Sequence, residues 1–149
     1  MANTYSGSPV TVEQPRLIEL PRIYDPRGNL TFVQNADGRI PFDIKRVFWT
    51  YDVPADAVRG SHAHYKCCEF LVALSGSFDV KLFDGVETRV FTLNRPYVGL
   101  YIPAGQWRTL ENFSSGCICV AMASDIYEEE DYIREYDDFL KLKKCSTRS

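Results

Sequence analysis

The chain has 149 residues, of which 45% are hydrophobic and 25% charged, and its formal net charge is −3. Such a composition is that of one globular domain, and the lack of a basic excess argues against nucleic acid as a main partner. No apolar run approaches the ~20 residues that span a bilayer, and residues 1–10 lack the features of a secretory signal. We therefore expect a single cytoplasmic domain over residues 1–149, with a flexible leader over residues 1–14 and no membrane contact.

Most of the chain alternates short β-prone segments with turn residues. Asp84-Gly85 is typical of a hairpin turn between two such segments. Strands are predicted where residues are β-branched or aromatic, where polar and apolar residues alternate, or where a short run is apolar throughout. These segments are residues 17–20, 30–34, 44–51, 70–74, 77–83, 87–93, 98–102, 107–110 and 117–123.

Residues 127–144 have a different pattern. The spacing of Tyr132, Ile133, Tyr136, Phe139 and Leu140 follows one face of a helix. Acidic residues precede this segment and lysines end it, as the helix dipole favours. We predict a short C-terminal helix near residues 132–142, packed outside the strands. Together the elements predict an all-β jelly-roll barrel, a fold whose interior can hold one small ligand.

The five cysteines are an odd number without a secretory signal, which favours reduced thiols in a cytoplasm. Cys67 and Cys68 are adjacent, and the sequence leaves open whether they form a reactive pair, form a vicinal disulfide or simply pack.

The chain contains two histidines, His62 and His64, separated by one residue. In an extended segment these side chains share one face, because side chains alternate along a strand. The pair is therefore either half of a metal site or two acid/base groups in one pocket. Histidine suits the second role because its ordinary pKa of about 6.5 lies close to neutral pH.

Two segments resemble the two sequence motifs of the cupin superfamily: His62-x-His64-x4-Glu69-x6-Gly76 and Pro103-x-Gly105-x2-Arg108-x3-Asn112. In metal-binding cupins three histidines and a glutamate hold the ion, and here Arg108 stands in the place of the third histidine. A guanidinium is no ligand and repels a nearby cation, so we predict no resident metal and no other cofactor. A metal-dependent cupin enzyme remains an alternative, because His62, His64 and Glu69 with water would form a workable open site.

A closer resemblance runs from about residue 17 to residue 142, to the cupin-fold sugar 3,4-ketoisomerases that act on dTDP-4-keto-6-deoxyglucose. Among the segments that carry it are Asp25-x-Arg27-Gly28-x-Leu30, Lys45-Arg46-Val47, Arg59-Gly60-x-His62-Ala63-His64 and Asp131-Tyr132-Ile133-Arg134. The resemblance implies a metal-independent enzyme and a homodimer, with residues 17–20 as the strand that subunits of this family often exchange. Departures from the family pattern at Tyr65, Glu69 and Arg108 leave the substrate isomer and the product configuration open.

Moving a ketone from C4 to C3 of a sugar requires a proton taken from C3 and one delivered to C4 through an enediol. The reaction needs a base, an acid and a donor to the enolate oxygen, but no redox cofactor. We assign the proton transfer at carbon to His64, and that at oxygen, or ring orientation, to His62. Tyr51 either donates to the developing oxyanion or is a core tyrosine, and Arg59 either binds phosphate or lies at the surface.

The expected ligand is a dTDP-linked keto sugar. Arg27, Arg46 and Arg108 offer cations for its diphosphate. Trp107 either stacks on thymine or fills the core, and Glu69 either contacts the substrate or is a buried partner of Arg59 or a histidine. The remaining alternatives are an epimerase of the same kind of nucleotide sugar and a non-catalytic sugar-binding cupin.

Overall fold

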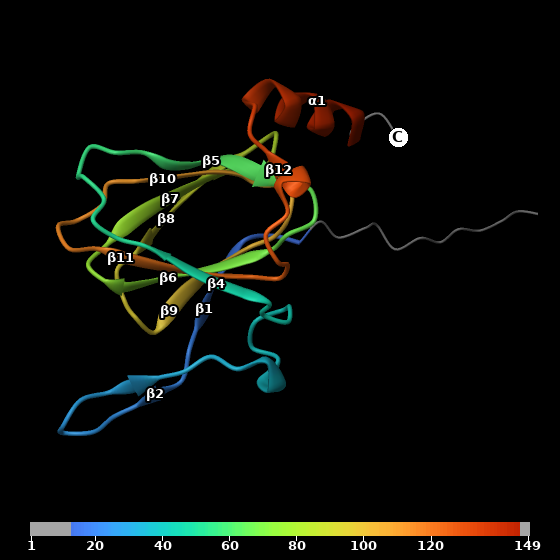
Figure 1. Cartoon of the computed structure of the whole chain (residues 1–149). Coiled ribbons are helices and arrows are strands. Elements are labelled where there is room, and N and C mark those ends of the chain that lie inside the picture. Colours follow the sequence, from blue (N-terminus) through green and yellow to red (C-terminus); the bar gives the residue numbers. More distant parts are fainter. Residues whose placement is uncertain (1–12, 147–149) are drawn as a thin grey trace, which may run out of the picture.

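The computed structural model of the protein describes residues 13–146 (Figure 1). Two five-stranded antiparallel sheets pack face to face, and one helix lies beyond them at the C-terminal end. This jelly-roll sandwich confirms the predicted all-β, cupin-type fold. Most of the expected leader lies outside the described residues. No helix within the described part of the chain is long and apolar enough to cross a membrane.

The first sheet has the strand order β1-β9-β6-β11-β4. Its strands are β1 (Arg16–Glu19), β9 (Val98–Ile102), β6 (Glu69–Ser75), β11 (Ile118–Ala123) and β4 (Arg46–Thr50). Side chains alternate between its two faces. Leu71, Leu100 and Ala121 lie in the core between the sheets, whereas Phe70 and Val72 lie in a second cluster on the outer face. The expectation that residues 70–74 are buried on both faces holds except for Leu74, which is exposed.

The second sheet has the strand order β12-β5-β10-β7-β8. Its strands are β12 (Tyr132–Ile133), β5 (Arg59–His64), β10 (Trp107–Glu111), β7 (Phe78–Phe83) and β8 (Thr88–Leu93). Phe78, Val80 and Leu82 of β7 are buried in the core, as the alternation in the sequence predicted. The edge strands β4 and β12 border the same open side of the sandwich, because Arg46 of β4 contacts Tyr132 of β12.

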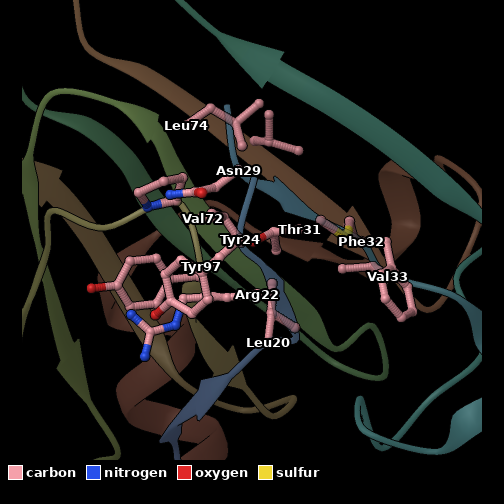
Figure 2. Close-up of a pocket in the computed structure, with 13 residues that line it drawn as sticks. Leu20, Arg22, Tyr24, Asn29, Thr31, Phe32, Val33, Val72, Leu74 and Tyr97 are labelled. Carbon is pink, nitrogen blue, oxygen red and sulfur yellow. The ribbon is translucent and has the colours of Figure 1, made fainter. Parts of the chain in front are cut away.

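The outer face of the first sheet is partly covered by the N-terminal region. A two-stranded hairpin, β2 (Arg22–Ile23) and β3 (Leu30–Thr31), and a 3-10 turn, η1 (Asn35–Asp37), follow β1. The strand predicted over residues 30–34 is thus only two residues long. A cavity of about 630 Å³ lies between this hairpin and the sheet (Figure 2). It is lined by Arg22 and Tyr24 from the hairpin and by Val72, Val120 and Met122 from the sheet.

The C-terminal helix begins later than predicted. A 3-10 turn, η2 (Glu129–Asp131), and strand β12 precede helix α1 (Tyr136–Ser146). Residues 127–135 therefore contradict the helical prediction, because the backbone at Tyr132 and Ile133 pairs with β5. Only the second half of the apolar spacing is helical: Phe139 is fully buried and packs against Trp107 on the outer face of the second sheet.

Candidate active site

The two imidazoles lie side by side on the inner face of β5. Their ring centroids are 4.9 Å apart and their planes are perpendicular, which confirms that the pair shares one face. Just before them the strand bulges: the β5–β10 register shifts between Arg108 and Leu110, and Gly60 has φ +91°. A side chain at Gly60 would be strained at this φ and would lie 3.3 Å from the Arg108 carbonyl oxygen. Bulges of this kind re-aim side chains beside active sites.

His62 is partly buried, and its Nδ1 lies 2.5 Å from the carbonyl oxygen of Gly60. Because a carbonyl only accepts hydrogen bonds, Nδ1 carries the hydrogen and Nε2 of the neutral ring has a free lone pair. Burial, followed by the positive charge of Arg108, lowers the pKa of His62 from 6.5 to about 4. The His62 ring is therefore neutral at pH 7 and able to accept a proton.

This lowered pKa predicts how the free energy of unfolding depends on pH. In the unfolded chain His62 returns to a pKa of 6.5, so the unfolded state binds a proton first as the pH falls from 6.5 to about 4. The contribution of neutral His62 to the free energy of unfolding is therefore complete above pH 6.5. As the pH falls through this window, the free energy of unfolding decreases by up to ~3 kcal/mol. We expect urea unfolding at pH 7 and pH 4.5 to show a larger loss for the wild type than for His62→Asn. Parallel losses in the two proteins would contradict the assignment.

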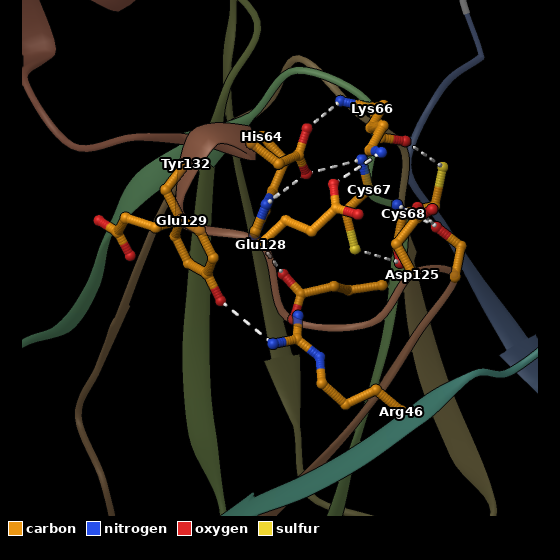
Figure 3. A network of polar contacts seen from close by, with 12 residues as sticks. Arg46, His64, Lys66, Cys67, Cys68, Asp125, Glu128, Glu129 and Tyr132 are labelled. Carbon is orange, nitrogen blue, oxygen red and sulfur yellow. Dashed lines mark hydrogen bonds and ion pairs between the residues drawn. The ribbon is translucent and has the colours of Figure 1, made fainter.

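His64 is only 1% exposed, and each of its ring nitrogens lies near a carboxylate (Figure 3). Nδ1 is 3.0 Å from Oδ2 of Asp131, and Nε2 is 3.3 Å from Oε1 of Glu69. The second contact is an ion-pair distance without hydrogen-bond geometry. Asp131 was not predicted as a site residue, because it is 67 residues from His64 in the sequence. The available signal was its place in the Asp-Tyr-Ile-Arg segment.

Glu69 and Arg108 form a buried ion pair next to the histidines. Arg108 Nη1 donates to Glu69 Oε1, and Arg108 Nη2 lies 3.4 Å from the carbonyl oxygen of Gln106. Burial alone would raise the pKa of Glu69, but the Arg108 guanidinium and the nearby His64 hold it at about 2. Glu69 is therefore ionised at neutral pH. Its partners are Arg108 and His64, which confirms the expectation of a buried histidine partner but not the one of a pair with Arg59.

Arg46 and Tyr132 close the open side of the sandwich over the imidazoles. The Tyr132 ring packs against His64 and His62, with centroid distances of 4.4 and 5.1 Å. Arg46 Nη1 lies 3.5 Å from the Tyr132 hydroxyl (Figure 3). Arg46 was expected in the site from the sequence, whereas Tyr132 was not, because the helical spacing predicted a helix where strand β12 forms.

Three buried side-chain atoms in the described residues have no hydrogen-bond partner, and all three belong to this group: Arg46 Nε, His64 Nε2 and Arg108 Nε. Buried polar atoms are nearly always paired, so unpaired ones call for an explanation. Their concentration beside the histidine pair marks a site built to receive polar groups from outside the chain.

Arg59 begins β5 and is exposed. Burial raises the pKa of the Cys119 thiol to about 12, and the Arg59 charge opposes this rise. Because Cys119 lies in the core between the sheets, the Arg59 charge influences the inner side of the sandwich. The structure thus brings together His62, His64, Glu69, Arg46 and Arg108, with Arg59 at the margin.

Tyr51 is not near the histidines, which corrects its expected role as oxyanion donor in this subunit. It follows β4 and lines a shallow cavity with Trp49 and Ile118. Trp49 pairs with Val120, whose side chain lies on the outer face of the first sheet. Tyr51 is two residues further along the same face and is 61% exposed.

Trp107 and Arg27 also lie outside the site. Trp107 neighbours the inward-facing Arg108 on β10, so it points outward, where it packs against Phe139 and Tyr136 of α1. This contact corrects the proposed stacking on thymine and bears out the core alternative. Arg27 lies in the turn between β2 and β3, with a 90% exposed side chain paired to Asp25 at 2.8 Å. That hairpin lies beyond the outer face of the first sheet (Figure 1), so Arg27 does not meet the histidines of its own chain.

Two sets of potential metal ligands occur in the described residues. The ligand atoms of His62, His64 and Glu69 lie within 4.8 Å of one another, as do those of His64, Cys67 and Asp131. In the first set Arg108 already occupies a Glu69 oxygen, and its charge opposes a cation. In the second set, both carboxylate oxygens of Asp131 already accept hydrogen bonds from backbone N–H groups of the β5–β6 turn. The donor sets thus favour the prediction of no resident metal, which stays a prediction.

Comparisons with known proteins agree with this architecture. The family model described as "FdtA: WxcM-like, C-terminal" matches residues 13–144. Over 126 residues the chain is 43% identical to TDP-4-oxo-6-deoxy-alpha-D-glucose-3,4-oxoisomerase from Aneurinibacillus thermoaerophilus, a match that covers 85% of this chain and 90% of that protein.

Two solved structures are also similar. One is a histidine-to-asparagine variant of the 3,4-ketoisomerase QdtA from Thermoanaerobacterium thermosaccharolyticum in complex with TDP-4-keto-6-deoxyglucose, with a TM-score of 0.87 and 37% identity over 93% of this chain and 99% of that one. The other is the TDP-quinovose 3,4-ketoisomerase WlaRB from Campylobacter jejuni, with a TM-score of 0.82 and 40% identity over 87% of this chain and 99% of that one. The chain therefore belongs to the WxcM-like, C-terminal (FdtA) family, as its resemblance to the sugar 3,4-ketoisomerases predicted.

Proposed function

We propose that the protein is a nucleotide-sugar 3,4-ketoisomerase that moves the ketone of dTDP-4-keto-6-deoxyglucose from C4 to C3. The observation that carries this proposal is the pair of imidazoles 4.9 Å apart, one neutral with a free Nε2, beside unpaired buried donors of Arg46 and Arg108. The names of similar proteins support the substrate class: a relative at 43% identity is a 3,4-oxoisomerase, and a structural neighbour holds the same keto sugar.

In the proposed mechanism His62 takes the proton from C3. Its Nε2 accepts the proton, the C3–H electrons form a C3–C4 double bond, and the C4 carbonyl electrons move to oxygen. The C4 oxygen takes up a proton to give the enediol. A proton is then delivered to C4, while the C3 hydroxyl loses its proton and becomes the ketone. The atoms and electrons balance without an oxidant or a reductant. This assignment reverses the one we expected from sequence, and it is supported by the greater exposure of His62 and the nearly complete burial of His64.

The other residues are assigned by their contacts. His64 presents Nε2 toward Glu69 and serves the oxygen-bound protons, since its Nδ1 is engaged by Asp131. Tyr132 takes the phenol role expected of Tyr51, because its ring lies against both imidazoles. Arg46, beside the Tyr132 hydroxyl, is the cation for a substrate phosphate or an enolate oxygen.

The direct test is incubation of the purified protein with dTDP-4-keto-6-deoxyglucose, with the ketone position followed by ¹³C NMR. We expect the carbonyl signal to move from C4 to C3, at the same rate before and after exhaustive chelation. Loss of activity on chelation, with recovery on addition of one metal, would favour a metal-dependent cupin enzyme. A sugar that binds but keeps its ketone at C4 would refute the proposed reaction.

We further propose that the protein is a homodimer, with the outer face of the first sheet as the contact surface. Val47, Trp49 and Leu74 are exposed on or near this face, beside the cavity under the N-terminal hairpin. Such apolar surface is typical of subunit contacts. In the structure β1 pairs with β9 of its own chain, and strand exchange would place the partner's β1 in that register. Arg27 would then bind a diphosphate only in the partner's site.

Light scattering at micromolar concentration is expected to give the dimer mass. Trp49→Glu should shift the protein toward monomer, because a buried charge opposes association. The matched control is Val90→Glu, an exposed apolar residue of β8 on the other sheet, which should leave the dimer intact. A wild type that is monomeric under these conditions would overturn the proposal.

A further inference from the structure

Asp131 is a buried carboxylate that lies deep behind the histidine pair. It is 6% exposed and sits at the end of the 3-10 turn η2, directly before Tyr132. Its Oδ1 accepts the backbone N–H of Lys66 at 2.8 Å, and its Oδ2 accepts the backbone N–H of Cys67 at 3.1 Å. The third partner is Nδ1 of His64, 3.0 Å from Oδ2. Both carboxylate oxygens are thus used, and among the hydrogen-bond partners in the described residues His64 is the one that contributes a side chain.

These contacts fix the position of Asp131 independently of the histidine. The two backbone N–H groups belong to the turn between β5 and β6, so they anchor the carboxylate relative to both strands. The backbone N–H of Tyr65 also donates to the Asp131 carbonyl oxygen at 3.0 Å. A carboxylate held in this way acts as a rigid acceptor, and the nitrogen of a histidine that faces it must carry the hydrogen.

We propose that Asp131 is a positioning residue for His64. The Asp131 carboxylate keeps the hydrogen of the His64 ring on Nδ1, so that Nε2 is the atom that exchanges protons. The catalytic role of this arrangement rests on the proposed function, whereas the position of the hydrogen on the His64 ring does not. Nε2 lies 3.3 Å from Glu69 and has no hydrogen-bond partner among the described residues. With Nδ1 anchored, the ring cannot rotate to exchange the two nitrogens, and charge that develops on the ring is stabilised by the carboxylate.

The state of the His64 ring can be observed directly, because the chain contains only two imidazoles. Long-range ¹H–¹⁵N NMR of tag-free protein, assigned with His62→Asn and His64→Asn, resolves each ring. We expect the neutral form of His64 to carry its hydrogen on Nδ1, with a downfield Nδ1–H resonance that reports a bond to a carboxylate. A neutral ring with the hydrogen on Nε2 in the wild type would overturn the proposal without the need for any variant.

Asp131→Asn keeps the size of the side chain but removes the charge and one acceptor. We expect kcat for ketone migration to fall on the order of 10–100-fold, a range typical of residues that orient a functional histidine, with little change in KM or in dTDP affinity. The downfield His64 resonance should move upfield or disappear. The matched control is Glu129→Gln in the same 3-10 turn, whose carboxylate pairs with Arg134 at the surface and should leave both readouts unchanged.

An Asp131→Asn protein that folds and keeps both its kcat and the His64 resonance would refute the positioning role. Equal losses in Glu129→Gln would also refute it, because they would reflect the turn rather than the carboxylate. If the wild type leaves the keto sugar unchanged, the proposed function fails, while the NMR spectra of the wild type and Asp131→Asn still decide the role of Asp131.

Discussion

His62→Asn is expected to lower the rate of ketone migration by ~10²–10⁴, the usual cost of removing a well-placed general base. His62 has the accessible ring of the pair, its Nε2 lone pair is free, and its pKa of about 4 keeps it neutral at pH 7. Asparagine removes the base but keeps a polar side chain of similar reach. Affinity for dTDP should remain near that of the wild type, because the cations that bind phosphate are unchanged. Steady-state kinetics and calorimetric titration with dTDP measure the two quantities.

His64→Asn should also be impaired, whereas Tyr51→Phe should be nearly as active as the wild type. The second expectation follows from the place of Tyr51 on the outer face of the first sheet. A large loss in Tyr51→Phe would show that this phenol reaches a site, such as that of a partner subunit. Full activity in both histidine variants would make the pair structural and the mechanism wrong.

Arg108→Met is expected to lower the free energy of unfolding by ~3–5 kcal/mol, because removal of one partner of a buried ion pair leaves the other charge uncompensated. Arg108 and Glu69 are both buried, and the Arg108 charge is the main influence that holds the pKa of Glu69 at about 2 against the opposing effect of burial. Urea unfolding at pH 7 measures the loss.

The double variant Arg108→Met, Glu69→Gln is the control for this interpretation. It removes both charges, so it should recover part of the stability lost in the single variant. If the single variant is as stable as the wild type, the pair does not carry the buried charge as described. If the double variant loses more free energy of unfolding than the two single variants lose together, the two residues contribute through packing instead.

Local patterns predicted the strands and the histidine pair because their information lies within a few residues. The alternation in β7 and the His-x-His spacing each depend on the period of a strand. The same period explains the errors at Trp107 and Tyr51, each of which lies one residue from an inward-facing position. Trp107 precedes Arg108, and Tyr51 follows Thr50, which pairs with the core residue Cys119. A shift of one residue changes the face, and composition does not indicate which face is inside.

The contacts of Asp131 and Tyr132 were beyond local patterns, because they depend on pairing between segments almost seventy residues apart. The apolar spacing of residues 132–140 is compatible with a helix, but backbone pairing with β5 and the bonds of Asp131 to the β5–β6 turn hold its first part extended. Tertiary contacts thus overrode the local pattern, and the overridden segment supplies two residues of the site.

The most direct test of the proton-transfer mechanism is incubation with dTDP-4-keto-6-deoxyglucose in deuterated water, with NMR of the sugar. For the wild type we expect a ketone at C3 and solvent deuterium at C4, and for His62→Asn we expect neither change. Deuterium that enters C3 while the ketone stays at C4 would indicate an epimerase, and deuterium at C4 in His62→Asn at the wild-type rate would contradict the assignment of His62 as the base.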